Sequence, residues 1–119
     1  MPTEPSPPTL AEVAERAAVI CDPPGTNDGV SELYRRFEDR DEPISAVAGI
    51  EAEVNGLVDP DEIDPAVRMA AAVIVYLAFR RDQVGGDPHD VLRLAARSQF
   101  DGQPPPAVVD WLAEQGVEP

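Results

Sequence analysis

Hydrophobic side chains recur along this chain at the three- and four-residue spacing of helices. One stripe lies between residues 10 and 20, and the next follows the i, i+3, i+4, i+7 rule for the buried side of a helix: Val30, Leu33, Tyr34 and Phe37. No run between turn signals alternates apolar and polar residues, so the pattern predicts no strand. The sequence therefore predicts an all-α fold.

Helix start and stop residues divide the pattern into five or six helices. Thr9 and Glu12 have the spacing of a capping box, and Asp64-Pro65 and Asp87-Pro88 are typical of helix starts. Asn55-Gly56 is a stop signal for a third helix that would begin at Pro43. The expected helices cover about residues 9–21, 27–38, 43–55, 65–84, 88–100 and 106–115.

The expected helix at residues 65–84 is the longest, and its middle is apolar on every side. The run from Met69 to Phe79 has no charged residue, so it must be covered all round by other helices. We therefore expect this helix at the centre of a compact bundle, with the aromatic side chains meeting near the core. The run is far shorter than the roughly 18 residues of a membrane span, so no membrane segment is expected.

The length of 119 residues fits one domain, which should bury about 60–70% of the surface of its unfolded chain. Residues 1–8 contain four prolines and no large side chain after Met1, which predicts a disordered tail. Residues 9–119 are then a single all-α domain. There is neither a signal-peptide pattern nor a second cysteine beside Cys21, so a reducing, cytoplasmic location is expected.

Negative charge is concentrated in one part of the chain. The net charge is −14, there is no lysine, and residues 38–64 carry ten acids against one base, Arg40. Such a field repels nucleic acid and anionic membranes and attracts basic protein surfaces. A GC-rich genome or a high-salt cytoplasm also favours acidic, lysine-free proteins, so composition alone leaves both explanations open. The imbalance favours a local role, because residues 1–65 total −12 and residues 66–119 only −2.

The predicted function is that of a small acidic interaction or regulatory module, of the antitoxin, immunity, nucleic-acid-mimic or assembly-subunit type. Asp59 and Asp64 are interpreted as helix caps. The residues expected to contact a basic protein partner are Glu38, Asp39, Asp41, Glu42, Asp61 and Glu62. The sequence leaves the identity of the partner and the oligomeric state open.

Few residues are available for catalysis or metal binding. His89 is the single histidine and Cys21 the single cysteine, which excludes zinc and di-iron centres within one subunit. We expect His89 at the surface and Cys21 in the core. No glycine-rich phosphate loop and no basic patch is present, so no cofactor is predicted.

One carboxylate pattern supports an alternative function. Glu12-x-x-Glu15 is followed after 22 residues by Glu38-x-x-Asp41. This spacing resembles that of the all-α, MazG-like nucleotide pyrophosphohydrolases, in which two helices hold magnesium. The resemblance implies a magnesium-dependent hydrolase of nucleoside triphosphates, with these four carboxylates as metal ligands. Here Pro43 follows the second pair, where the family continues its helix.

Overall fold

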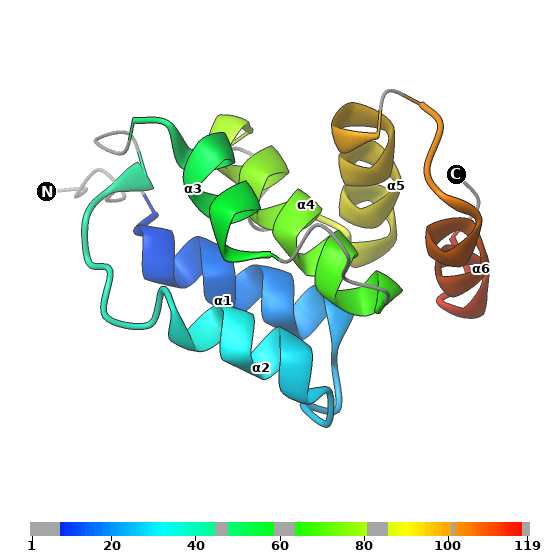
Figure 1. The fold of residues 1–119 in the computed structure, drawn as a ribbon, viewed down its shortest axis with the longest axis horizontal. Helices are drawn as coiled ribbons and strands as arrows, with labels where there is room; N and C mark the ends of the chain where they lie inside the picture. Colours follow the sequence, from blue (N-terminus) through cyan, green and yellow to red (C-terminus); the bar gives the residue numbers. More distant parts are fainter. Residues whose placement is uncertain (1–7, 45–47, 59–63, 81–85, 101, 118–119) are drawn as a thin grey trace, which may run out of the picture.

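Helix α4 (Pro65–Phe79) runs through the middle of the molecule, and the other helices pack around it (Figure 1). The computed structural model describes residues 8–44, 48–58, 64–80, 86–100 and 102–117. Within these ranges there are six helices, and the predicted all-α fold is confirmed. The five helices around α4 are α1 (Leu10–Cys21), α2 (Asp28–Arg35), α3 (Ile50–Leu57), α5 (Pro88–Gln99) and α6 (Pro106–Glu114).

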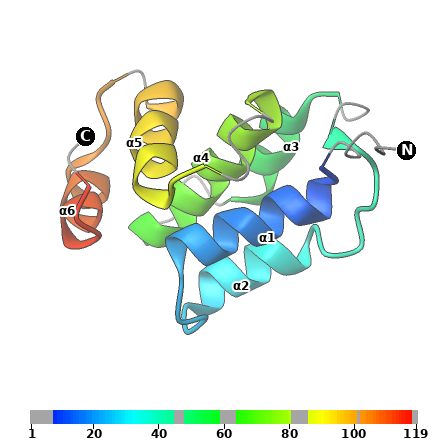
Figure 2. The ribbon, with the colours of Figure 1, turned by 180° about the vertical axis from the view of Figure 1, so that it is seen from behind.

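The central position of α4 follows from its apolar circumference. Every residue from Met69 to Leu77 is buried. Helices α1 and α2 pack side by side against α4, as the reverse view in Figure 2 shows, and α3, α5 and α6 contact α4 as well. Full burial of one large aliphatic side chain contributes about 1.5–3 kcal/mol, so this single helix organises much of the core.

The predicted end of α4 is wrong. Arg80 already has φ −118° and ψ 68°, so the helix ends at Phe79 and does not continue to residue 84. Phe79 is 65% exposed and does not join the other aromatic side chains in the core. Most helical stability in proteins comes from tertiary packing, and the cover over α4 ends at this point.

Side-chain caps set the starts of four described helices. The Thr9 hydroxyl accepts from the backbone N–H of Glu12 at 3.1 Å, which confirms half of the predicted capping box. Asn27, Asp64 and Asp87 accept in the same way from first-turn amides of α2, α4 and α5. Each cap satisfies a helix donor that has no intrahelical partner.

The predicted bounds of the third helix are also wrong. Helix α3 begins at Ile50, directly after Gly49, which adopts a left-handed φ of +68°. Asn55 and Gly56 lie inside the helix and do not end it. Pro43 forms an antiparallel bridge with Thr9 and Ile44 directly after it has 3₁₀ geometry, so no α-helix of the described residues begins at Pro43. This long-range pairing holds Pro43 itself extended at the position where the sequence indicated a helix start.

Cys21 and the helix lengths agree with two further expectations. The thiol of Cys21 is buried, and this burial, with a smaller effect of the neighbouring Asp22, raises its pKa far above the usual value. Such a thiol is a packing group, not a nucleophile. None of the described helices combines the length and the apolar character that a bilayer crossing requires.

Candidate functional site

The acidic loop, residues 38–42, lies against the first turn of α1. The N–H groups of Leu10 and Ala11 donate to the carbonyl oxygens of Glu42 and Arg40, each at 3.0 Å. First-turn amides have no partner within their own helix, so the loop supplies acceptors that α1 lacks. The partial positive charge of this helix end also favours acidic side chains beside it. The loop is therefore held in place in part through its backbone, which leaves the side chains of Glu38, Asp39 and Asp41 available.

Arg40, the only base in this loop, is occupied by two glutamates. Its guanidinium donates to both carboxylate oxygens of Glu42, at 2.8 and 3.0 Å, and to Glu53 of α3. The hydrogen bond from Arg40 lowers the pKa of Glu42, and the bonds to Glu42 and Glu53 raise the pKa of Arg40. These contacts tie the loop to α3. Glu38, Asp39 and Asp41 are the exposed acids of the loop that do not bond to Arg40.

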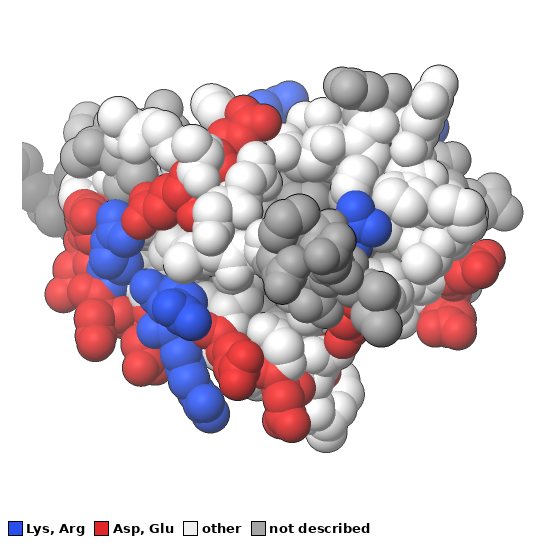
Figure 3. All heavy atoms as spheres, viewed as in Figure 1, with Lys and Arg blue, Asp and Glu red and all other residues white. Residues whose placement is uncertain are grey.

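The structure places the predicted partner-binding residues in two groups. Glu38, Asp39, Asp41 and Glu42 are exposed on the acidic loop. Asp61 and Glu62 lie outside the described residues, as does the predicted cap Asp59. In Figure 3 the acidic side chains gather along the edge of the molecule that carries the loop and α2, with arginines between them, whereas most of the described surface on the α5 side is uncharged.

Two other acids of residues 38–64 have different roles. Asp64 caps α4 and also accepts from the Asn27 side chain at 3.0 Å, which links the starts of α2 and α4. This confirms that Asp64 is a structural residue. Glu51 lies on α3 and faces a groove over α4.

The four carboxylates of the magnesium alternative do not form a metal site in the described residues. Glu12 and Glu15 are exposed on α1. Glu38 and Asp41 follow the end of α2 at Arg35, so they are not on a helix facing α1. Within the described part of the chain, no three His, Cys, Asp or Glu side chains lie close enough together to hold one metal ion.

We therefore expect no hydrolysis of nucleoside triphosphates. Magnesium needs near-octahedral oxygen ligands at short distance, and this arrangement does not supply them. Release of pyrophosphate from common and modified triphosphates, with magnesium or manganese, measures the activity. Turnover that disappears in Glu38→Gln but persists in the control Glu114→Gln, on α6, would contradict this expectation and restore the hydrolase hypothesis.

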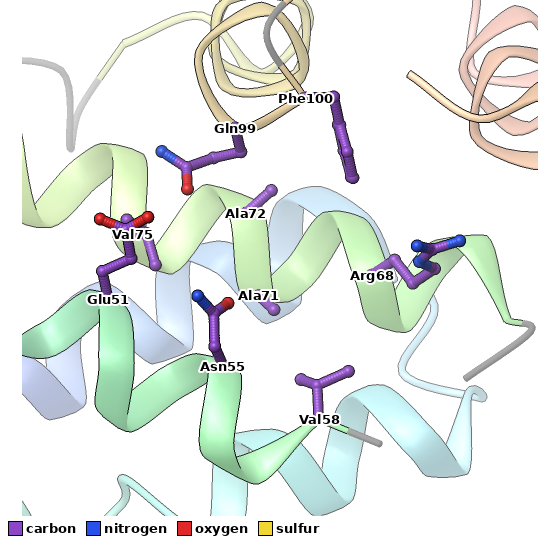
Figure 4. Close-up of a pocket in the computed structure, with 9 residues that line it drawn as sticks. All are labelled: Glu51, Asn55, Val58, Arg68, Ala71, Ala72, Val75, Gln99 and Phe100. Atoms are coloured by element: carbon purple, nitrogen blue, oxygen red, sulfur yellow. The ribbon is translucent and has the colours of Figure 1, made fainter. Parts of the chain in front are cut away.

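The sequence pattern did not indicate a groove that crosses α4 between α3 and α5. These two helices both pack on α4 but barely contact one another. The groove consists of two adjoining cavities, of about 330 and 710 Å³, that share Glu51 and Gln99. Figure 4 shows the first cavity, with α3 on one side, the end of α5 on the other and α4 as the floor. It is lined by Glu51, Asn55, Val58, Arg68, Ala71, Ala72, Val75, Gln99 and Phe100.

The second cavity continues the groove towards the end of α4. It is lined by Glu51, Tyr76, Phe79, Arg80, Leu94, Arg97, Ser98 and Gln99. Among the described residues, the floor and the end of the groove are largely apolar, and the charged side chains of the lining are three arginines and one acid, Glu51. In a chain of net charge −14, this described lining carries more basic than acidic side chains. Periodicity reveals which helix faces are apolar, but it does not reveal a gap between two covering helices.

Comparison of the chain with protein-family models, with curated proteins and with solved structures finds no match.

Proposed function

We propose that this chain is a small acidic interaction or regulatory module of the cytoplasm, which presents the acidic loop to a basic protein surface. The observation that carries the proposal is the fixed position of the loop. Its backbone carbonyls accept from the first turn of α1, while the carboxylates of Glu38, Asp39 and Asp41 stay exposed. Arg40 is occupied by Glu42 and Glu53, so the loop offers acids and no available base.

A loop held in this way suits recognition of a charged partner. A surface that is already ordered loses less conformational entropy on binding. Complementary charge mainly accelerates association, and it also disfavours partners of the same sign. The proposal therefore concerns a basic protein and not nucleic acid or an anionic membrane. Antitoxin, immunity, nucleic-acid-mimic and assembly-subunit roles are all consistent with it.

The test compares two charge reversals of equal size. Asp39→Lys with Asp41→Lys changes the acidic loop, and Asp110→Lys with Glu114→Lys changes exposed positions of α6. Glu42 stays unchanged, because it forms an ion pair with Arg40, and its replacement would change folding as well as binding. Proteins captured from a lysate of the source organism are identified at low and high salt, and the association rate is then measured with the purified partner.

We expect the wild type and the α6 variant to capture the same salt-sensitive protein. The loop variant should associate with it about tenfold more slowly at low salt, since steering depends on local charge. Circular dichroism establishes that both variants are folded. Equal losses in the two variants would show that net charge and not the loop is responsible. Unchanged capture by the loop variant would assign the acidity to solvation or salt adaptation.

A further inference from the structure

We propose that the groove over α4 is a docking site for an amphipathic helix of a partner protein, with acidic residues flanking its apolar stripe. This surface is separate from the acidic loop, so the proposal goes beyond the function proposed above. It rests on the shape of the groove, on its charge, and on two features of α4 that an occupant would complete.

The shape of the groove suits a helix. Its floor is one face of α4 and follows helical spacing from Arg68 through Ala71, Ala72 and Val75 to Phe79. At a rise of about 1.5 Å per residue this face is about 17 Å long, or roughly three helical turns. Ala71, Ala72 and Val75 on this floor are already buried, so an occupant would cover mainly the partly exposed apolar side chains of the walls, Val58, Leu94 and Phe100. Sites for small molecules enclose most of their ligand, whereas this surface is an open trough.

The charge of the groove selects an acidic occupant. Arg68 and Arg97 line the two cavities, and neither has an ion pair or hydrogen-bond partner among the described residues. Arg80 lies at the same margin, and Glu51 is the one acid in the described lining. Arginine forms geometrically specific, charge-assisted hydrogen bonds with carboxylates. Aspartate or glutamate beside the apolar stripe of a partner helix would supply them.

Two features of α4 remain incomplete in the free protein. Tyr76 is buried and lines the second cavity, and its hydroxyl has no hydrogen-bond partner among the described residues. A buried unpaired hydroxyl has a cost in free energy, which a polar group of an occupant would remove once Tyr76 turns this fully buried oxygen into the second cavity. Phe79, at the end of the same face, exposes 65% of its surface. A partner helix that covers Phe79 would complete the apolar circumference of α4.

The test uses three synthetic helical peptides with the same leucine stripe and with Glu, Gln or Lys at the flanking positions. Binding is measured by fluorescence anisotropy at about 0.15 M salt, where the Debye length is about 8 Å and distant charges are screened. We expect the affinity to fall in the order Glu peptide, Gln peptide, Lys peptide, with a Kd about tenfold lower for the Glu peptide than for the Lys peptide. The net charge of −14 acting alone would give the reverse order, so the two explanations are distinguished.

Matched variants locate the binding site. Arg68→Gln with Arg97→Gln should remove the preference for the Glu peptide, and the same change at Arg35 and Arg36, exposed on α2, should not. Phe79→Ser should weaken the binding of all three peptides about tenfold, whereas Val19→Ser, at an exposed apolar position of α1 outside the groove, should have no effect. These positions are exposed or at the surface, so the variants should remain folded.

Three results would overturn the proposal: no binding of the Glu peptide, the order Lys, Gln, Glu, or equal effects of the groove variants and their controls. The loop variant Asp39→Lys with Asp41→Lys should bind the Glu peptide at least as well as the wild type. The two proposals are therefore tested independently: a negative result for the groove does not contradict the acidic loop, and a negative result for the loop does not contradict the groove.

Discussion

Replacement of Leu77 by alanine should lower the free energy of unfolding by about 2–5 kcal/mol. Leu77 has no exposed surface and lies in the stretch of α4, from Met69 to Leu77, in which every residue is buried. The substitution removes three buried side-chain carbon atoms, Cγ and the two Cδ methyl groups, and leaves a cavity, because a close-packed interior relaxes only in part. Urea unfolding followed by circular dichroism gives the change directly.

Leu57→Ala is the matched control for this prediction. Leu57 belongs to α3 and exposes 39% of its surface, so the same chemical change should cost less than about 1 kcal/mol. If Leu77→Ala costs as little as Leu57→Ala, α4 is not covered in the way described here. An interface between copies of the chain would then be the better explanation of its apolar character.

Gly29→Ala should destabilise the protein by about 1–3 kcal/mol, although alanine is normally the better helix former. Gly29 lies in α2 where this helix crosses α4, and a Cβ atom at this position would be only 2.6 Å from Cγ2 of Val67. Val67 is buried and β-branched, so its methyl group cannot move away without disturbing the core. Thermal unfolding of the variant measures the effect.

Gly56→Ala is expected to have the opposite sign. Gly56 lies in α3, and a Cβ atom there would meet nothing within 4 Å. The free energy of unfolding of the variant should therefore rise by about 0.5–1 kcal/mol. The double variant Gly29→Ala with Val67→Ala should lose less stability than the sum of the losses in the two single variants, because the second change removes the contact that causes the strain. Additive losses, or a stabilising Gly29→Ala, would contradict the close approach of α2 and α4.

The starts of most helices could be predicted from the sequence because caps are local. Asn27, Asp64 and Asp87 each accept from an amide two or three residues further along the chain. Helix formation at these positions depends on neighbours that the sequence shows directly. The central position of α4 could be predicted for a related reason, since an apolar circumference has to be covered whatever covers it.

The errors occurred where distant residues decide the backbone. Pro43 has the sequence context of a helix start, but its pairing with Thr9 holds it in an extended bridge, and α3 begins only at Ile50. The end of α4 at Phe79 depends on where the neighbouring helices stop covering it. The local sequence pattern indicates neither the bridge between Pro43 and Thr9 nor the position at which the cover over α4 ends.

The same division applies to the two candidate surfaces. The sequence by itself determined that residues 38–64 are acidic and which helix is buried. It also excluded a metal centre built from several histidines or cysteines, because the chain has only one of each. Only the tertiary structure decided that Arg40 is occupied by Glu42 and Glu53, and that α3 and α5 leave a groove with arginines at its margin. Charge and capping act over a few residues of chain, whereas a groove exists only where helices far apart in the sequence pack on a third and barely contact each other.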